Sequence, residues 1–270
     1  MRSLLISLVI LLTASAAASA EEQAYFPYRL DPATDLVLAS SGCAIAGTSI
    51  YLYEVKSPPG IVETLSARKS GLNPLDRSAA GLHTYGSATA STVLAGASAA
   101  VPLLLTVPLF TEHRSTAALT YLAMYAEVVV LNAGITGLCK GLVNRKRPFL
   151  YRTNVFDRKP RNADAAMSFY SLHTSIAFSS LVFMATVFGD MYRDPLYRSL
   201  VWIGSISTAG VTGILRVVSG NHFPTDIIAG AAAGSIIGCI VPLVHRIGDR
   251  RVTVAVIAGD TYGLSASLSF

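Results

Sequence analysis

Six apolar stretches, each close to twenty residues long, limit how this chain can fold more than any other feature. A helix needs about 20 apolar residues to cross the ~30 Å hydrocarbon layer of a bilayer. The stretches are also rich in Gly, Ala and Ser, which let helix backbones approach each other closely in lipid. They occupy residues 35–53, 88–110, 116–139, 172–189, 199–218 and 226–244. We therefore predict an all-α membrane protein, a six-helix transmembrane bundle, in which the first stretch is the weakest span because several Ser, Thr and Gly residues dilute it.

The composition agrees with a membrane bundle. Apolar residues make up 52% of the 270 residues and charged residues only 14%, whereas an average soluble domain has about 25% charged residues. A soluble helical bundle would carry polar residues at every third or fourth position, and these stretches mostly do not. The formal net charge is +5, but the basic residues lie beside apolar segments. We therefore expect membrane lipids as partners and no nucleic acid, and the pattern shows no obligate protein partner.

The three cysteines lie inside apolar stretches, at Cys43, Cys139 and Cys239. They are odd in number and have no C-x-x-C spacing. The pattern therefore predicts neither a disulfide framework nor a zinc site.

Both ends of the chain differ from its apolar middle. Residues 1–20 combine Arg2, a short apolar run and Ala18-Ser19-Ala20, which is the pattern of a secretory signal peptide; an uncleaved anchor is the alternative. The last residues alternate around a turn at Gly259-Asp260, which predicts a short C-terminal β-hairpin. The expected divisions are a signal peptide at 1–20, an N-terminal segment with a weak first span and a connecting loop at 21–87, the membrane bundle at 88–245 and the hairpin tail at 246–270.

Three polar clusters stand at the ends of apolar stretches, and counting spans places all three on one side of the membrane. The first is Lys140-x6-Arg147-Pro148. Seven residues are about two helical turns, so both cations can point to one side if the helix continues. Arginine offers a planar fork that matches phosphate oxygens, and lysine adds a point charge. Basic residues at a helix end also bind lipid head groups, so this cluster alone is a weak signal.

The second cluster, Ser171-Leu172-His173, begins the fourth stretch. Backbone N–H groups at a helix N-terminus, together with the Ser171 hydroxyl, form a seat for an anion. His173 beside that seat can pass a proton to a leaving oxygen. A single histidine near a helix start is more often an ordinary polar residue, so this cluster is also weak by itself.

The third cluster is Arg216-x5-His222-x3-Asp226. His222 and Asp226 are four residues apart, so on a helical turn the carboxylate can accept the proton of one imidazole nitrogen. That bond fixes the tautomer and leaves the other nitrogen free to attack. Arg216 adds a third cation for the same phosphate. Such a His-Asp pair is common by chance, but two histidines, three cations and a serine on one membrane face are not.

In this order, and separated by apolar spans, the three clusters resemble the three motifs of the type 2 phosphatidic acid phosphatase family, which belongs to a superfamily that includes vanadium haloperoxidases. The resemblance covers roughly residues 85–245. It implies an integral membrane enzyme, a phosphoric monoester hydrolase that acts on the phosphate monoester or diphosphate of a lipid.

The resemblance also implies a role for each motif residue. His222 would be the nucleophile that forms a phosphohistidine, Asp226 would orient it, and His173 would be the general acid for the leaving alcohol. The phosphate of the substrate would be held by Lys140, Arg147, Ser171 and Arg216. No metal or other cofactor is implied, because three cations and a helix end neutralise the charge that develops during phosphoryl transfer, and the sequence shows no carboxylate cluster able to hold magnesium.

Two positions depart from the family pattern. The family usually has Pro-Ser-Gly-His, whereas this chain has Tyr170-Ser171-Leu172-His173. Leu172 can still donate its N–H, but its side chain can narrow the phosphate seat or alter the preferred substrate, since glycine lets a backbone approach phosphate most closely. The third motif commonly has Ser before the Arg, whereas this chain has Leu215. Every expected titrating and cationic residue is present, so neither departure predicts an inactive enzyme.

We expect a multi-pass protein of a bacterial inner membrane with its active site facing the periplasm. A cleaved signal peptide followed by six spans would instead place the site in the cytoplasm, and the basic segment 140–161 would fit the positive-inside rule there. If the 35–53 stretch does not cross, or if the N-terminus stays inside, the site faces the periplasm. Bacterial members of the family mostly act on that face.

Two other functions compete with a lipid phosphatase. A vanadate-dependent haloperoxidase would use the same oxyanion site, but such enzymes are typically soluble. A non-catalytic protein that binds lipid head groups would need the cations but not His173, His222 and Asp226. Among lipid phosphatases, the pattern fits phosphatidic acid, phosphatidylglycerol phosphate, a polyprenyl diphosphate or a lipid A phosphate as the substrate.

Overall fold

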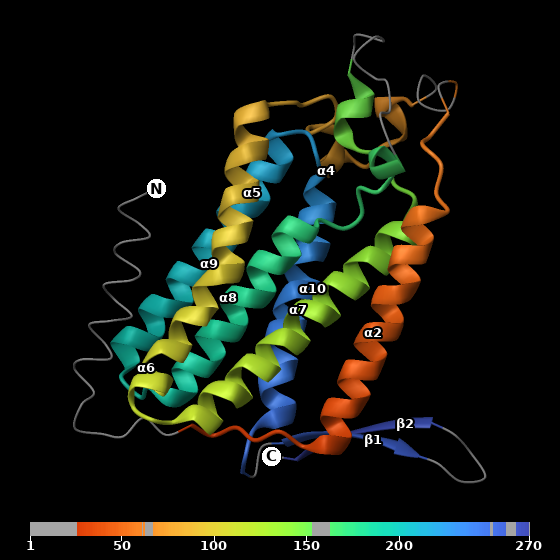
Figure 1. Cartoon of the computed structure of the whole chain (residues 1–270). Coiled ribbons are helices and arrows are strands. Elements are labelled where there is room, and N and C mark those ends of the chain that lie inside the picture. Colours follow the sequence, from red (N-terminus) through yellow and green to blue (C-terminus); the bar gives the residue numbers. More distant parts are fainter. Residues whose placement is uncertain are drawn as a thin grey trace.

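In a computed structural model of the chain, long helices run side by side and form one bundle (Figure 1). The structure describes residues 26–60, 62, 67–152, 163–248, 251–257 and 263–269. The predicted signal peptide at 1–20 and the predicted turn at Gly259-Asp260 lie outside these ranges. Six segments are long and apolar enough to cross a membrane. The described residues between 32 and 245 therefore form an all-helical bundle with short connections, and the chain is a multi-pass integral membrane protein, as predicted.

The six segments agree with the six apolar stretches to within a few residues. They are α2 (Pro32–Glu54), the combined α5 (Tyr85–Ala100), η2 (Val101–Leu105) and α6 (Thr106–Thr111), α7 (Ser115–Val143), α8 (Leu172–Met191), α9 (Pro195–Val218) and α10 (Pro224–His245). Short elements lie between them at one end of the bundle: η1 (Lys69–Gly71), α4 (Pro74–Arg77), η3 (Pro148–Tyr151) and η5 (Ala163–Ala166).

Capping residues explain why several helices begin where they do. The Asp31 carboxylate accepts a hydrogen bond from the Thr34 N–H (3.0 Å), and Pro32 occupies the first turn of α2. Asp194 accepts from Leu196 N–H (2.8 Å) at the start of α9 in the same way. An N-cap oxygen satisfies an N–H group that has no partner within the helix. Helices α2 and α9 therefore start a few residues before the apolar stretches that predicted them.

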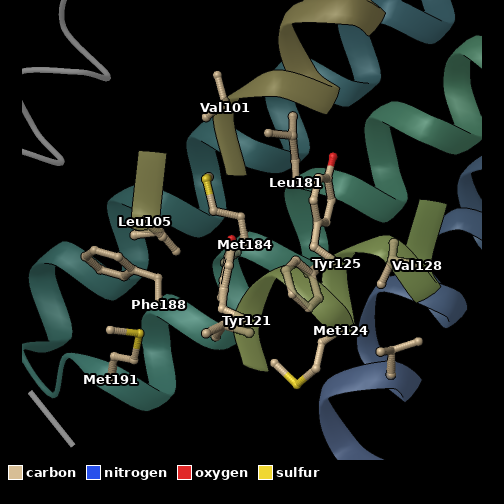
Figure 2. Close-up of a cluster of buried hydrophobic side chains, with 14 of the residues drawn as sticks. Val101, Leu105, Tyr121, Met124, Tyr125, Val128, Leu181, Met184, Phe188 and Met191 are labelled. Atoms are coloured by element: carbon tan, nitrogen blue, oxygen red, sulfur yellow. The ribbon is translucent and has the colours of Figure 1, made fainter. Parts of the chain in front are cut away.

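The aromatic core lies in the half of the bundle away from the three motifs (Figure 2). Phe183 of α8 packs against Tyr121 and Tyr125 of α7, with ring centroids 5.1 and 5.3 Å apart. Tyr121 also donates a hydrogen bond to the carbonyl of Pro102 (2.8 Å), in the 3-10 turn that interrupts the second span. Proline cannot donate a backbone hydrogen bond inside a helix, so this span is not one continuous helix. The core thus holds α7, α8 and the interrupted span together.

A row of glycines brings α10 into backbone contact with α8. At each of three glycines, an added Cβ would lie within 3 Å of a serine carbonyl oxygen at the start of α8 or along it. The distances are 2.9 Å from Gly230 to Ser171, 2.3 Å from Gly234 to Ser175 and 2.5 Å from Gly238 to Ser179. Small residues at every fourth position permit this close approach in a membrane. The start of α8 and the start of α10 are therefore held in a fixed register.

The N-terminal helix α2 packs mainly against α7. At its beginning, Tyr28 forms an isolated β-bridge with Arg246, just after α10. Both ends of the described chain thus meet at the end of the bundle opposite the motifs (Figure 1). The predicted weak span is therefore a full helix of 23 residues, which is long and apolar enough to cross a membrane beside the others.

Beyond α10, the strands β1 (Arg251–Ile257) and β2 (Gly263–Ser269) pair antiparallel, with Arg251 opposite Ser269. Residues 258–262, which would form the turn between them, are outside the described ranges. The hairpin as a complete unit stays a prediction. All three cysteines are free thiols, which agrees with the absence of a disulfide pattern in the sequence.

Candidate active site

The three motifs meet at one end of the bundle, at the end of α7, the start of α8 and the connection between α9 and α10 (Figure 1). Lys140 lies in the last turn of α7, but the helix ends at Val143 because Asn144 adopts a left-handed conformation (φ 55°). Arg147 follows in extended backbone. The condition for aligning the two cations by helical spacing, a helix that continues to Arg147, is therefore not met, and a non-helical segment brings Arg147 to the site.

Arg147 is buried, and its guanidinium forms hydrogen bonds on two sides. Nη1 lies 3.3 Å from His222 Nε2 and donates to the Asn221 carbonyl (2.9 Å). On the other side, Nη2 donates to the Asp164 carboxylate (2.7 Å) and Nε to the Asp164 carbonyl (2.8 Å). These contacts fix the plane of the guanidinium beside the imidazole. They also show that Asp164 occupies part of the fork that a phosphate would bind.

His222 is fully buried, and its hydrogen bonds select one tautomer. Nδ1 lies 2.7 Å from the backbone carbonyl of Ser168. A carbonyl can only accept, so Nδ1 carries the proton. Nε2 is therefore unprotonated, and its lone pair accepts a hydrogen bond from Arg147 Nη1 (3.3 Å). This is the arrangement that a histidine nucleophile needs.

Asp226 does not accept the imidazole proton, contrary to the prediction. Its Oδ2 lies 3.7 Å from His222 Nδ1. Instead it accepts from the Ser168 hydroxyl (2.5 Å) and from the Phe223 N–H (2.8 Å), which caps α10. Since α10 begins at Pro224, His222 precedes the helix and the spacing of a helical turn does not apply. Asp226 thus positions the residues around the histidine, and the Ser168 carbonyl orients the ring.

The other predicted residues surround this pair. Ser171 is the N-cap of α8, and its hydroxyl oxygen accepts from the Thr174 N–H (3.3 Å). His173 is half-buried in the first turn, with Nε2 3.2 Å from the Thr92 hydroxyl of α5. Arg216 is buried in the last turn of α9, where it donates to Ser91 (3.3 Å) while its Nε has no hydrogen-bond partner among the described residues. An unpaired guanidinium N–H in this position is available to an anion.

The electrostatic environment keeps His222 neutral. Burial lowers the pKa of His222 well below its ordinary value, and the positive charges of Arg147, Lys140 and Arg216 lower it further. Desolvation and nearby like charges both disfavour the protonated ring. The histidine therefore retains its lone pair at neutral pH, at the point where three cations converge.

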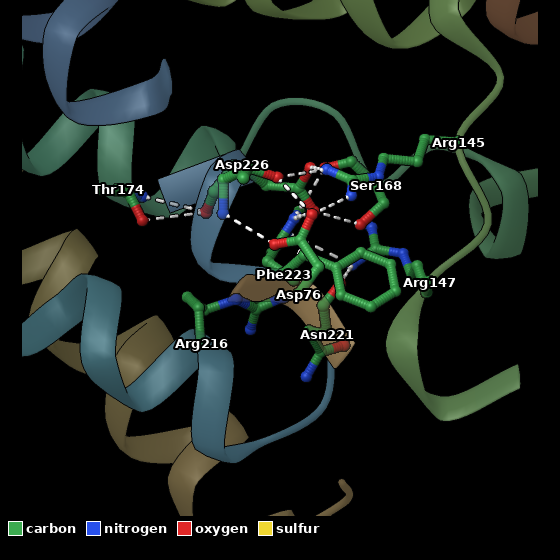
Figure 3. Close-up of polar contacts among 12 residues, drawn as sticks. Asp76, Arg145, Arg147, Ser168, Thr174, Arg216, Asn221, Phe223 and Asp226 are labelled. Atoms are coloured by element: carbon green, nitrogen blue, oxygen red, sulfur yellow. Dashed lines mark hydrogen bonds and ion pairs between the residues drawn. The ribbon is translucent and has the colours of Figure 1, made fainter. Parts of the chain in front are cut away.

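Two residues behind the histidine were not predicted. The sequence marked Arg145 only as part of a basic loop. Its guanidinium donates to Asp226 and to the Thr225 hydroxyl (2.7 Å). The same group lies 4.4 Å from the centre of the Phe223 ring (Figure 3). Its other nitrogen forms an ion pair with the buried Asp76 (2.5 Å). Burial raises the pKa of Asp76, but hydrogen bonds from Thr225, Arg145 and Asn73 outweigh this effect and hold the pKa below its ordinary value. Asp76 is therefore an ionised partner of Arg145.

Asp76 belongs to the connecting segment 54–87, which the sequence predicts to be an irregular or partly helical surface segment. Ala79 and Ala80 of this segment pack on Phe223, and the Gly81 N–H donates to the Pro148 carbonyl (2.9 Å). A Cβ at Gly220 (φ +71°) would lie 1.7 Å from the Leu82 carbonyl oxygen. The segment is therefore part of the wall of the site. No local sequence signal marks this role, because the partners of the segment lie far away along the chain.

Comparison with known proteins agrees with this arrangement. Residues 117–248 match the profile described as the PAP2 superfamily. This part of the chain, just under half of it, belongs to the PAP2 superfamily. The PAP2 segment contains all seven predicted site residues, whereas Asp76 and the partners of His173 and Arg216 on α5 lie before it.

Individual relatives cover different parts of the chain. A lipid A 1-phosphatase of Porphyromonas gingivalis is 32% identical over 83 residues, which are 31% of this chain and 17% of that protein. The structure of a transmembrane PAP2 type phosphatidylglycerolphosphate phosphatase from Bacillus subtilis is 20% identical with a TM-score of 0.44, and the match covers 87% of this chain and 92% of that chain.

Proposed function

We propose that this PAP2 protein is a membrane phosphatase that hydrolyses a phosphate monoester or diphosphate of a lipid through a phosphohistidine on His222. One observation carries the proposal: the buried His222 holds its proton on Nδ1, so its unprotonated Nε2 lies among the cations and accepts a hydrogen bond from Arg147. A head-group-binding protein would need the cations but would gain nothing from a neutral, oriented imidazole among them.

In the first step, Nε2 of His222 attacks the phosphorus of the substrate. The N–P bond forms as the bond between phosphorus and the lipid oxygen breaks. His173, in the first turn of α8, donates its proton to that oxygen, so the lipid leaves as an alcohol. Lys140, Arg147 and Arg216, together with N–H groups at the start of α8, would neutralise the charge on the phosphoryl oxygens.

In the second step, water attacks the phosphohistidine. His173, now neutral, accepts a proton from the water, the N–P bond breaks, and phosphate leaves while Nε2 regains its lone pair. The Ser168 carbonyl accepts the Nδ1 hydrogen bond throughout, so the ring does not rotate between the steps. The residues present perform both steps without a metal ion.

The lipid itself is a narrower proposal. The relative from P. gingivalis is a lipid A 1-phosphatase, but the matched region is a small part of that protein. Leu172 is partly exposed at the first position of α8, next to His173. An apolar side chain at this edge suits an acyl or prenyl chain better than a soluble phosphate ester. We therefore place the substrate among membrane lipid phosphates.

The predicted periplasmic site and the predicted signal peptide exclude each other if all six segments cross. The beginning of α2 lies at the end of the bundle opposite the site. Cleavage after residue 20 would leave that end outside and the site in the cytoplasm. We propose the periplasmic orientation in a bacterial inner membrane, as for most bacterial members of the family, with residues 1–20 retained on the cytoplasmic side without crossing. Alkaline phosphatase inserted after residue 160 of the full chain should then be active, and the same reporter after residue 270 should be inactive; the reverse pattern would place the site in the cytoplasm.

The activity is tested by phosphate release from a panel of lipid phosphates, with purified wild type and His222→Gln in the presence of EDTA. Wild type should release phosphate and should carry radioactive phosphate on histidine after a rapid acid-free quench. His222→Gln should lose at least about 10³-fold in rate, since the nucleophile itself is missing. His113→Asn, an exposed histidine at the opposite end, is the control. Equal rates in wild type and His222→Gln would refute the mechanism, and vanadate-dependent peroxidase activity would favour the haloperoxidase function instead.

A further inference from the structure

A second cluster of ionisable side chains lies at the end of the bundle opposite the candidate active site. Asp35 is in the first turns of α2, Glu127 is in α7, and His245 is the last residue of α10. One ligand atom from each lies within 4.8 Å of the other two. His245 is 19 residues after Asp226 on the same helix, so about 28 Å separate the two sites. The cluster therefore takes no part in the proposed phosphoryl transfer.

The histidine of this cluster has the orientation of a metal ligand. His245 Nδ1 lies 2.9 Å from the carbonyl of Val241, so Nδ1 carries a proton. Nε2 then points at the Asp35 Oδ1 (2.7 Å) and the Glu127 Oε2 (3.4 Å). Metal-bound histidines typically donate their other ring N–H to a carbonyl or carboxylate in this way, which orients the metal-binding nitrogen.

Among the described residues, the cluster forms no ion pair with a lysine or arginine side chain. The His245 side chain is fully buried, and the Glu127 Oε2 is buried without a hydrogen-bond partner among the described residues. With both carboxylates ionised, the cluster carries −1 while Nε2 donates its proton to Asp35, and −2 when that proton has left to make room for an ion. The neighbouring Arg246 is engaged elsewhere, in an ion pair with Asp190. A divalent cation would neutralise the group, which matters because uncompensated charge inside a membrane protein is costly.

We propose that Asp35, Glu127 and His245 bind one divalent transition-metal ion, for which zinc has the best-fitting ligand set and geometry. Zinc binds His nitrogen and carboxylate oxygen at about 2.0–2.2 Å in a tetrahedron, which sets neighbouring ligand atoms about 3.4 Å apart. The distance from His245 Nε2 to Glu127 Oε2 has this value. The distance to Asp35 Oδ1 must lengthen by about 0.7 Å, which the partly exposed Asp35 side chain allows. Water would complete the coordination.

Such an ion would cross-link three helices. It would join the outer helix α2, which packs mainly against α7, to both α7 and α10. The sequence showed no carboxylate cluster able to hold magnesium, and it did not indicate that these two carboxylates and a histidine come together. Asp35 and Glu127 are 92 residues apart along the chain, and Glu127 and His245 are 118 residues apart, so no spacing motif indicates the site. The ion would stabilise the fold and leave the rate of catalysis unchanged.

The test measures zinc on the full chain purified in detergent, stripped with chelator and reloaded with zinc chloride. After gel filtration, wild type should retain about one zinc per chain by mass spectrometry, and zinc should raise its melting temperature by several degrees. Glu127→Gln and Asp35→Asn, which keep the shape of the side chain, should bind zinc at least about 10-fold more weakly and lose the thermal shift. His113→Asn, which removes an exposed histidine at the same end, should behave as wild type.

Two results would overturn the proposal. The first is that wild type retains no zinc at micromolar concentrations, which would mean that a proton shared by His245 and Asp35 is the only cation of the cluster. The second is that both carboxylate variants bind zinc as wild type does. Asp35→Asn changes a partly exposed side chain, so it remains informative if Glu127→Gln fails to fold. Phosphatase activity is not a readout of this test, and its outcome is therefore separate from that of the proposed function.

Discussion

Removing the Asp76 carboxylate should destabilise the protein and disturb the active site together. Asp76 is fully buried and accepts hydrogen bonds from Arg145 (2.5 Å), from the Thr225 N–H (3.0 Å) and from the Thr225 hydroxyl (2.7 Å). In Asp76→Ala, Arg145 loses one of its two carboxylate partners and the Thr225 N–H loses its acceptor.

The expected magnitude follows from these contacts. Breaking a buried ion pair by removing one partner costs about 3–5 kcal/mol. Arg145 is about one-fifth exposed and keeps its contact with Asp226, so solvent and the second carboxylate reduce this cost to about 2 kcal/mol. The unpaired Thr225 N–H adds about 1–2 kcal/mol. We therefore expect Asp76→Ala to lower the free energy of unfolding by about 3–4 kcal/mol, and Asp76→Asn, which keeps an acceptor for Thr225, by about half of that.

The assay is denaturant unfolding in detergent, together with kcat/KM on a lipid phosphate. Because Arg145 also contacts Asp226 and the Phe223 ring beside His222, kcat/KM should fall about 10-fold or more at temperatures where the variant is folded, with most of the effect in kcat. Arg77→Ala is the matched control, since it removes an exposed charge from the same short helix. If Asp76→Ala and Arg77→Ala unfold at the same denaturant concentration with equal kcat/KM, the segment 54–87 is not a wall of the site and the reasoning fails.

Three further outcomes are expected. Gly234→Ala should push α8 and α10 apart and cost about 1–3 kcal/mol with a loss of kcat, whereas Gly210→Ala, whose Cβ would meet nothing within 4 Å, should be neutral or slightly stabilising in the same unfolding assay. Folded His222 stays neutral while an unfolded histidine takes up a proton below its ordinary pKa of 6.5. The free energy of unfolding should therefore not change above pH 6.5. At pH 5.5 it should have fallen by about 1.4 kcal/mol more in wild type than in His222→Gln. Equal pH dependence of the two proteins would show that the ring titrates normally. Asp164→Asn should release the Arg147 fork and tighten competitive inhibition by phosphate several-fold, and unchanged inhibition would mean that Asp164 does not compete with the substrate.

The spans and the motif residues could be predicted because their signals are local. The number of crossing segments follows from the length of the apolar runs, and the residues of the three motifs follow from spacing within a few turns. Span counting then correctly placed the motifs at one end. The interruption at Pro102 was missed because the apolar run continues through it, so composition alone does not mark the change of helix type.

The contacts within the site could not be predicted because they depend on where helices end. The four-residue spacing of His222 and Asp226 suggested a direct hydrogen bond, but α10 begins after His222 and the Ser168 carbonyl, 54 residues earlier, takes the proton instead. The pairing of Arg145 with Asp76 spans 69 residues and arises only when the segment 54–87 folds over the site. Such long-range pairs leave no periodic trace in the sequence.

The glycine row between α8 and α10 also restricts the route by which a lipid reaches His222. Where the two backbones touch, no gap remains between the helices for an acyl chain to slide through from the bilayer. This seam is therefore closed to a substrate that moves laterally in the membrane, and the lipid tail must pass along another face of the bundle while its phosphate enters the site. Selection among lipids would then begin with the shape of that passage, before any contact with the catalytic residues.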